Sequence, residues 1–360
     1  MPNAEIVGWG KAMPPTVLSN ADLERIVDTN DEWITSRTGM KERRITHVEA
    51  SDLAAVSARR ALAAAGMEAT ELDFIINATC TPESLIPASV AHVQTKIGAD
   101  GAGAMDVNAN CSGFVYGLVT AASLIQTGAA RNVLLTGVEK MHYIMDYSDR
   151  TTCVLFGDGA GSVVLRPTLE PVGYLGGVLG NDGSISEHLT VPEFGSAGSR
   201  GARSHAHCGV QMNGPEVFRN AVTRMGEAAL QVAKDVGWTR DDIDLLIPHQ
   251  ANKRIIDATA RRLELDENKV FIDVDRYGNT SAATIPVALT EALEEGRVKP
   301  GANLIFAAFG GGLSWAAAAV KWGERTEPIA HSDAELGSFD GTVFDILRPT
   351  LEFSGVEVPR

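Results

Sequence analysis

Residues 58–79 read ARRALAAAGMEATELDFIINAT, and residues 228–250 read AALQVAKDVGWTRDDIDLLIPHQ. Each stretch passes from an alanine-rich helical pattern through a glycine and an acidic turn into a short apolar run, which is typical of a helix followed by a buried strand. Asp244 lies 171 positions after Asp73, and in both copies a glycine stands 7 residues before the aspartate. The chain therefore contains the same unit twice.

Three further pairs of segments support an internal duplication. They are residues 104–107 with 271–274, residues 132–135 with 303–306, and residues 163–165 with 318–320, at offsets of 167, 171 and 155. The last offset agrees least well with the others. Any α/β protein shows some similarity of this kind, but here the order and the offset agree together, which favours a true duplication.

Short stretches that are apolar on both faces are typical of parallel strands covered by helices on each side. Such stretches lie at residues 73–78, 132–137 and 303–308. Helical patterns alternate with them at residues 53–65, 112–128, 217–236, 252–263 and 285–296. This alternation predicts two α/β halves packed together, with helices outside and between the sheets.

The halves are expected at residues 1–170 and 171–323, although the length alone fits two average domains and one large unit equally well. Residues 181–214 are rich in Gly, Ser and His, and we expect a functional or mobile loop there. Residues 324–360 carry eight acidic and three basic residues and form a separate acidic extension. This extension could cover a dimer edge, dock a partner or be disordered.

The composition excludes several classes of function. The formal net charge is −15, which repels nucleic-acid phosphates, so no nucleic-acid partner is expected. The N-terminus shows no signal peptide and no apolar run is long enough to span a bilayer, so membrane insertion is not expected. None of the four cysteines forms a C-x-x-C pair, so a disulfide scaffold or zinc site is implausible and a reducing cytoplasm fits best.

Cys111 lies in the segment DVNANCSGF (residues 106–114), where an apolar strand turns into a helix. The unpaired N–H groups and the positive end of the helix dipole would stabilise a thiolate, so the pKa of Cys111 is expected to be lowered. The alternative is a buried, inert cysteine. That interpretation is the one we adopt for Cys80, Cys153 and Cys208.

His249 and Asn279 occupy two other turns of this kind. His249, in IPHQAN (residues 247–252), follows an apolar strand at its carboxyl end, where catalytic groups gather in parallel sheets. Asn279, in YGNTSAA (residues 277–283), lies in the counterpart of the Cys111 turn. The alternative for His249 is a structural histidine that only satisfies hydrogen bonds. The alternative for Asn279 is a simple Gly-Asn turn.

Other motifs carry less weight. The segment FGGGLS (residues 309–314) places three glycines after a strand, so that backbone N–H groups could approach an oxyanion. His205 and His207 form an H-x-H pair without an evident third ligand, so no metal is expected. Residues 157–161 (GDGAG) lack the dinucleotide-binding spacing, and neither a P-loop nor a nucleophile elbow occurs.

Together these motifs resemble the β-ketoacyl-acyl-carrier-protein synthase III family of the thiolase superfamily. The resemblance covers roughly residues 4–322 and includes NDEWI at residues 30–34, RTG at residues 37–39 and FGDGA at residues 156–160. It implies an α/β thiolase-like fold in which two duplicated halves pack as five layers (αβαβα), and a homodimer. It also implies that Cys111, His249 and Asn279 form a Cys-His-Asn triad.

The resemblance also implies binding residues for coenzyme A and the substrate. Trp33 and Arg150 would hold the adenine, Arg37 and Arg254 would line the pantetheine and phosphate entrance, and Phe309 would contact the substrate. Ile86 stands where family members close the acyl pocket across the dimer. A mid-sized aliphatic residue at that position suggests a short to medium or branched acyl group.

An acyl carrier protein is the implied protein partner. Arg219, Lys253 and Arg254 would meet its acidic surface. Lys253 and Arg254 also form a basic cluster with Arg261 and Arg262 in the sequence itself, for which a solvated helix face is the alternative.

The implied chemistry needs coenzyme A thioesters as substrates and no further cofactor. Cys111 attacks an acyl-CoA, and the N–H groups of Cys111 and Gly312 hold the oxyanion. Malonyl-carrier protein then binds. Nε2–H of neutral His249 and the amide of Asn279 stabilise the enolate that forms as carbon dioxide leaves. The carbanion attacks the acyl-cysteine and yields a 3-ketoacyl thioester.

Two rival functions remain open. A relative that primes a polyketide or joins acyl chains would carry the same triad, so the sequence barely separates it from a starter of fatty acid synthesis. A non-catalytic subunit that pairs with a synthase should lack the nucleophile, whereas Cys111 is present.

Overall fold

A computed structural model describes residues 2–192 and 209–359 of the chain. Its two large sheets share one plan. The first has the strand order β1 (Asn3–Ala12), β7 (Gly159–Thr168), β6 (Val133–Glu139), β4 (Phe74–Ala78) and β5 (Gly103–Val107). The second has the order β8 (Gly173–Asn181), β13 (Ser314–Lys321), β12 (Asn303–Gly310) and β11 (Leu245–Pro248). In both, the first three strands alternate in direction and the fourth pairs parallel with the third.

The residue pairing within the two sheets is also equivalent. Val133 on β6 pairs with Leu165 on β7, and Leu304 on β12 pairs with Val320 on β13. The match of residues 163–165 with 318–320 is therefore confirmed in spite of its offset. That offset is smaller than the others because a long connection joins β6 to β7, whereas a tight turn joins β12 to β13.

The prediction that residues 271–274 form a strand like β5 is wrong. Only Val270 continues the second sheet, through a single parallel bridge to Leu246. The N–H of Asp273 is bound by Oε1 of Gln250 at 3.1 Å, and the chain enters the short helix α8 (Val274–Tyr277) at once. The backbone groups that a longer strand would need are therefore already in use.

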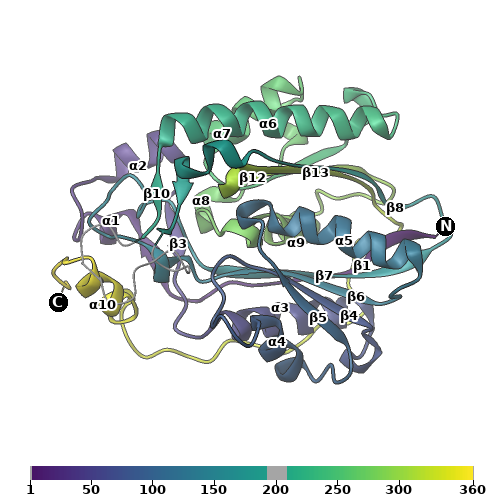
Figure 1. Cartoon of the computed structure of the whole chain (residues 1–360), viewed down its shortest axis with the longest axis horizontal. Helices are drawn as coiled ribbons and strands as arrows, with labels where there is room; N and C mark the ends of the chain where they lie inside the picture. Colours follow the sequence, from purple (N-terminus) through teal and green to yellow (C-terminus); the bar gives the residue numbers. More distant parts are fainter. Residues whose placement is uncertain (1, 193–208, 360) are drawn as a thin grey trace.

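The expected helices are confirmed with small changes in their ends. They are α3 (Ala50–Ala65), α5 (Gly113–Thr127), α6 (Gly214–Asp235), α7 (Lys253–Arg262) and α9 (Thr284–Glu294), whereas α4 (Ser89–Ile97) was not expected from the sequence. Figure 1 shows five layers from top to bottom: α6 with α7, the second sheet, α5 with α9, the first sheet, and α3 with α4. Ten of the eleven residues of α9 are buried, as a helix between two sheets requires.

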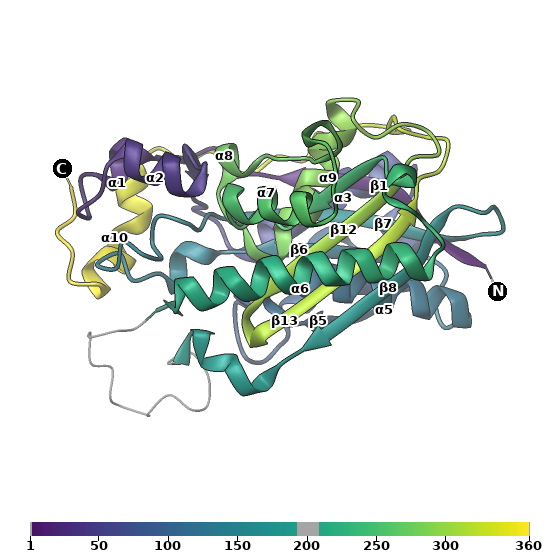
Figure 2. The same cartoon turned by 90° about the horizontal axis from the view of Figure 1, so that it is seen from above.

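Smaller elements complete the fold. Strands β2 (Val17–Ser19) and β3 (Glu42–Arg44) pair with each other, as do β9 (Leu189–Thr190) and β10 (Gln211–Met212). Helices α1 (Asn20–Leu23) and α2 (Asp31–Thr38) lie at one end of the molecule (Figure 2). Short 3-10 turns include η3 (Met141–Ile144), η4 (Gly183–His188) and η9 (Gly311–Leu313). Others are η1 (Ala69–Glu71), η6 (Arg240–Asp242) and η7 (Glu267–Lys269). His205, His207 and Cys208 lie outside the described residues.

The C-terminal extension lies along the body of the protein instead of standing apart from it. The N–H groups of Ile329 and Ala330 donate to the carbonyl oxygens of Ala64 and Ala63, each at 3.1 Å. The ring of Phe339 stacks on His47 with the centroids 5.2 Å apart. The described part of the extension is therefore attached to α3 and its surroundings, and the alternative of a disordered tail is wrong for it.

The extension ends in helix α10 (Val343–Phe353), which lies beside α1, far from the N-terminus (Figure 2). A capping box between Thr342 and Asp345 begins the helix. Its buried side chains join the same apolar cluster as residues of α1 and η3, and they are Val343, Phe344, Leu347 and Leu351. Because apolar burial is the main stabilising term, α10 is part of the folded core.

Leu347→Ala is expected to lower the free energy of unfolding by about 3 kcal/mol, because it leaves a cavity at a side chain that is 0% exposed. Urea unfolding followed by circular dichroism measures the change. Glu352→Ala, on the exposed face of the same helix, is the control and should stay within about 0.5 kcal/mol. Equal, small effects of the two substitutions would contradict a stabilising role for α10.

Candidate active site

Two turns with the same backbone shape contact each other between the sheets. The turn η2 (Asn110–Ser112) leads into α5, and η8 (Ser281–Ala283) leads into α9. Asn110 has φ 51° and Ser281, 171 positions later, has φ 50°. Non-glycine residues in this left-handed region are strained and gather at functional sites. The predicted match between the Cys111 and Asn279 turns is thus confirmed.

A cavity of about 740 Å³ brings together the three residues predicted to form the triad. Cys111 from η2, His249 from the end of β11 and Asn279 from the residues before η8 all line it. A second cavity, of about 550 Å³, also reaches Cys111. The thiol therefore lies where two cavities meet, so that two substrate groups could approach it from different sides.

Burial raises the pKa of the Cys111 thiol to about 12, while hydrogen bonds from Ser281 and from the backbone oppose the rise and the Glu139 carboxylate adds to it. The prediction of a lowered pKa is therefore wrong for the chain without substrate. Cys111 is only 8% exposed, and its loss of hydration outweighs the effect of the helix dipole. A proton acceptor must take the thiol proton when an acyl donor arrives.

His249 is neutral, as the predicted mechanism requires, because burial lowers its pKa to about 3. Its Nδ1 lies 2.7 Å from the hydroxyl of Thr284, which also lies 3.0 Å from the carbonyl oxygen of Ser281. The hydroxyl has one hydrogen. When it donates to Nδ1, Nε2 carries the proton and can donate to a substrate carbonyl. When it donates to Ser281, Nε2 is a proton acceptor.

Asn279 is oriented by its own turn. The N–H of Ser281 donates to Oδ1 of Asn279 at 2.8 Å. The backbone of Asn279 is fixed to the neighbouring segment by bonds to Leu155 at 2.9 Å and Gly157 at 3.0 Å. Because Oδ1 is occupied, the Nδ2 amide group is the donor left for the cavity. This geometry fits the predicted neutral donor.

The glycine loop packs directly against the backbone of Cys111. A side chain at Gly310 would come within 2.7 Å of the Cys111 nitrogen, and Gly312 has φ 131°, which favours glycine. Gly312 and Cys111 both line the second cavity, whereas Phe309 lines the first. The oxyanion role of the Cys111 and Gly312 N–H groups stays a prediction.

Trp33 lines the first cavity, and two arginines lie close to its ring. The guanidinium carbons of Arg37 and Arg150 lie 4.9 and 5.3 Å from the centre of its ring. Arg150 is held by the carbonyl oxygen of Asp28 at 2.8 Å, and Arg254 lines the same cavity. An aromatic ring flanked by cations suits a purine that carries phosphates. The structure therefore brings the four residues predicted to bind coenzyme A to one region.

Most of the predicted carrier-binding cations already have carboxylate partners. The pairs are Arg219 with Glu216 and Lys253 with Asp257 at 2.8 Å, and Arg262 of the adjoining basic cluster pairs with Glu227 at 3.0 Å. Arg254 instead lies over the ring of Phe218, 5.4 Å from its centre. The surface predicted to bind the carrier protein therefore has a weaker positive potential than the sequence indicates. Arg254 links this surface to the first cavity.

Ile86 does not line either of the two cavities of its own chain. It is 85% exposed, and Leu85 beside it, which lines the second cavity, is 95% exposed. Two neighbouring aliphatic side chains at such exposure are unusual in a monomer. The predicted role of Ile86 in an acyl pocket therefore depends on a second copy of the chain.

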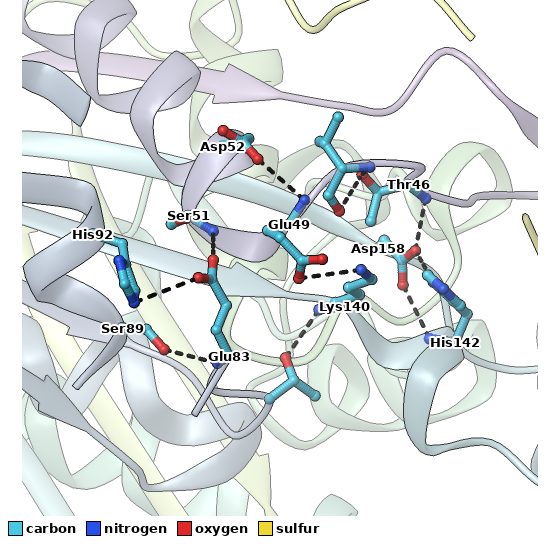
Figure 3. A network of polar contacts seen from close by, with 12 residues as sticks. Thr46, Glu49, Ser51, Asp52, Glu83, Ser89, His92, Lys140, His142 and Asp158 are labelled. Atoms are coloured by element: carbon cyan, nitrogen blue, oxygen red, sulfur yellow. Dashed lines mark hydrogen bonds and ion pairs between the residues drawn. The ribbon is translucent and has the colours of Figure 1, made fainter. Parts of the chain in front are cut away.

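A polar network fixes the turns that form the wall of the second cavity (Figure 3). The N–H of Ser51 donates to Glu83 at 2.7 Å, and the N–H of Lys140 donates to the hydroxyl of Thr81 at 2.9 Å. The ammonium group of Lys140 pairs with Glu49 at 3.3 Å. These bonds connect the start of α3 to the segments after β4 and β6, which line the second cavity.

Three residues of the site were missed from the sequence: Glu139, Ser281 and Thr284. Glu139 ends an otherwise apolar strand at its carboxyl end, which is a signal that could have drawn attention to it. Ser281 and Thr284 lie in the turn that mirrors the Cys111 turn. The approach of Ser281 to Cys111 depends on the packing of the two halves, whereas Thr284 contacts His249 within the second half.

Within residues 2–192 and 209–359, no group of three or more His, Cys, Asp or Glu side chains could hold a metal ion. In the same residues, the helices lack the length and apolar character needed to cross a bilayer.

Two family profiles match the chain. The one described as 3-oxoacyl-[acyl-carrier-protein (ACP)] synthase III matches residues 105–183, and its C-terminal counterpart matches residues 233–322. A β-ketoacyl-[acyl-carrier-protein] synthase III 2 of Vibrio vulnificus is 48% identical over 349 residues, which are 97% of this chain and 96% of that protein. Such coverage includes most of residues 324–360, so the extension has a counterpart in that relative.

Solved structures agree with these matches. The 3-oxoacyl-[acyl-carrier-protein] synthase III of Aquifex aeolicus superposes with a TM-score of 0.84 at 43% identity, over 89% of this chain and 100% of that one. The priming β-ketosynthase of the R1128 polyketide pathway superposes with a TM-score of 0.82 at 33% identity, over 90% of this chain and 97% of that one. The predicted thiolase-like fold is confirmed.

Proposed function

The chain belongs to the 3-oxoacyl-[acyl-carrier-protein] synthase III family, and from this premise we propose how its residues perform the condensation. It is an acyltransferase that joins an acyl group from acyl-CoA to malonyl-acyl-carrier protein and releases coenzyme A and carbon dioxide, which starts fatty acid synthesis. The observation that carries the proposal is the first cavity, because Cys111, His249 and Asn279 all line it. Nucleophile and enolate-stabilising donors are thus within reach of one substrate.

In the first half-reaction, acyl-CoA enters through the first cavity with its adenine against Trp33. The Cys111 sulfur attacks the thioester carbonyl, and the oxyanion is held by the N–H groups of Cys111 and Gly312. Coenzyme A then leaves as a thiol. The acyl chain extends into the second cavity, which reaches Cys111 from the other side.

In the second half-reaction, the malonyl thioester occupies the place that coenzyme A has left. Nε2–H of His249, with Thr284 donating to Nδ1, and Nδ2–H of Asn279 bind its carbonyl oxygen. Both donors are neutral, so they stabilise the enolate that forms as carbon dioxide leaves. The carbanion then attacks the acyl-cysteine, and the 3-ketoacyl product departs on the carrier protein.

The working unit is a homodimer in the cytoplasm. Two features support a dimer: β5 lies at the edge of the first sheet, and the nearby side chains of Leu85 and Ile86 are 95% and 85% exposed. Cys80, Cys111 and Cys153 are free thiols, which fits a reducing compartment. No cofactor beyond the thioester substrates is needed by this chemistry.

The proposal is tested by incubating the purified chain with single acyl-CoA starters and locating the adduct by mass spectrometry of peptides. An acyl group is expected on Cys111, and malonyl-carrier protein should discharge it as a 3-ketoacyl product. An adduct on another residue, or no adduct with any starter, would contradict the proposed role.

Priming of a polyketide is the second candidate, because the R1128 priming β-ketosynthase shares the fold at 33% identity. The triad serves both functions, so the starter and the carrier decide between them. Comparing the carrier proteins of fatty acid and polyketide synthesis as malonyl donors separates the two. A clear preference for the fatty acid carrier would exclude the second candidate.

A further inference from the structure

A carboxyl group that the chemistry above does not use lies close to Cys111. Glu139, the last residue of β6, is 0% exposed. Thr81 donates its hydroxyl to Oε2 at 2.6 Å, Ser281 donates its hydroxyl to Oε1 at 3.0 Å, and the N–H of Cys80 lies 3.1 Å from both oxygens. A fully buried carboxyl held only by neutral donors is costly and needs a reason to be there.

Within residues 2–192 and 209–359, no cation pairs with Glu139 to balance its charge. Among the ion pairs of the described residues none includes Glu139, and its neighbour Lys140 pairs with Glu49 instead. The titratable groups that face it are the thiols of Cys80 and Cys111. Burial raises the pKa of Glu139, while hydrogen bonds from Thr81 and Cys80 oppose the rise. Glu139 therefore accepts a proton more readily than an exposed carboxylate.

Ser281 connects this carboxyl to the reactive sulfur. Its hydroxyl bonds to Oε1 of Glu139 at 3.0 Å and lies 3.6 Å from the sulfur of Cys80, and its hydrogen bond to Cys111 lowers the pKa of that thiol. Ser281 and Cys111 also line the same cavity. The N–H and carbonyl groups of Ser281 are bound by Asn279 at 2.8 Å and Thr284 at 3.0 Å, so the strained residue is held firmly.

The internal duplication explains why a carboxyl occupies this place. Glu139 ends β6 as Gly310, 171 positions later, ends β12. A side chain at Gly310 would meet the backbone nitrogen of Cys111 at 2.7 Å, and Oε1 of Glu139 lies 3.5 Å from the nitrogen of Ala282, the counterpart of Cys111. In η8 the carboxylate of Glu139 therefore occupies the place that stays open for a substrate oxygen in η2.

We propose that Glu139 accepts the thiol proton of Cys111 through the hydroxyl of Ser281 as the acyl thioester is attacked. The thiol proton passes to Oγ of Ser281 while the proton of that hydroxyl passes to Oε1 of Glu139. The new bond joins the sulfur of Cys111 to the acyl carbon, and the bond to coenzyme A breaks with its electron pair on the leaving sulfur. Glu139 then returns the proton through Ser281 to the coenzyme A thiolate.

The relay keeps a single negative charge in a buried site. A charged Glu139 raises the pKa of Cys111, whereas a neutral carboxylic acid does not. Moving the charge from carboxylate to sulfur avoids two adjacent buried anions. His249 is a poor alternative acceptor in the resting site, because burial lowers its pKa to about 3.

The relay predicts a particular pH profile for acylation, which rests on the proposed reaction of Cys111. At pH values between the pKa of Glu139 and that of Cys111, the proton moves within the site and the rate is flat. Below this range Glu139 is protonated and the rate falls. Without the relay, the thiol must ionise to solvent, and the rate rises in proportion to hydroxide concentration.

Glu139→Gln is the main test, measured as single-turnover acyl transfer from acyl-CoA to Cys111 across pH. The glutamine oxygen can still accept from Ser281 and Cys80, and its amide can donate to the hydroxyl of Thr81, so the packing is retained. Acylation is expected to fall about 100-fold at neutral pH, and the flat profile should become a steady rise with pH. Decarboxylation of malonyl-carrier protein should change far less.

Two further variants make the assignment specific. Ser281→Ala breaks the relay but leaves the carboxylate, so it should give the same altered profile, and combining it with Glu139→Gln should cause no further loss. Thr81→Val removes a donor that lowers the pKa of Glu139. The acid limb should then move to higher pH while the plateau remains.

The relay is overturned if the acylation rate of Glu139→Gln or Ser281→Ala depends on pH as it does in the unmodified chain, whatever the size of the rate. Faster acylation by Glu139→Gln would also overturn it. This result is expected if the charge of Glu139 does no more than raise the pKa of Cys111. A failure of the proposed function looks different: the unmodified chain would form no acyl adduct on Cys111 at any pH.

Discussion

Cys111→Ala is expected to leave no acyl adduct on the chain and to reduce condensation on the order of 10⁶-fold, because removing a nucleophile removes the whole covalent route. The measurement is the yield of acyl-enzyme after incubation with acyl-CoA, followed by assay of the 3-ketoacyl product. The small alanine should fit without strain, since Cys111 lies in a wall between two cavities.

The same variant separates the two half-reactions. His249 and Asn279 remain in place, so decarboxylation of malonyl-carrier protein should persist and release an acetyl thioester. Cys153→Ala is the matched control, because Cys153 is equally a free thiol but is 0% exposed in the apolar core. Acyl adduct formation by the Cys111→Ala chain would contradict the assignment of the nucleophile.

The duplication explains why much of this site could be read from the sequence. The offset of 171 residues relates Asp73 to Asp244, and the same offset relates the strained residues Asn110 and Ser281. Strand, turn and helix are local patterns, so their order revealed which turns are equivalent. The sequence alone therefore predicts that the turn carrying Asn279 is the counterpart of the Cys111 turn.

The protonation state of Cys111 could not be read in the same way. The sequence shows a helix N-terminus next to the thiol, which lowers a pKa, but it does not show how much water is removed when the two halves close over it. In the structure burial dominates and raises the pKa to about 12. The contacts of Glu139 were hidden for the same reason, since they join β6 to turns of both halves.

The prediction that the C-terminal extension is a separate acidic segment was wrong for a different reason. Its acidic composition drew attention to charge, whereas the spacing of Val343, Phe344, Leu347 and Leu351 is that of an amphipathic helix, and Thr342 begins it with a capping box. Both signals were present in the sequence. The face that these residues cover, beside α1 and η3, could be identified only from the fold.

Asn279→Asp is expected to reduce decarboxylation of malonyl-carrier protein by about 100-fold to 1,000-fold, the usual cost of losing one oxyanion donor. The new carboxylate can still accept the N–H of Ser281, as Oδ1 of Asn279 does at 2.8 Å, so the turn should keep its shape. Its second oxygen, however, replaces an N–H donor with a negative charge beside the developing enolate. Acyl loading, which precedes the enolate, should change only a few-fold.

The mirror substitution Asn108→Asp provides a matched contrast. Oδ1 of Asn108 accepts the N–H of Asn110 at 3.2 Å in the equivalent turn, but its side chain lines the second cavity instead of the first. It should therefore leave decarboxylation within a few-fold. Carbon dioxide release and acyl-enzyme formation are measured separately for both variants. An equal loss of the two half-reactions in Asn279→Asp would indicate a collapsed site, because a group that acts only on the enolate has no means of slowing the attack of Cys111 on acyl-CoA.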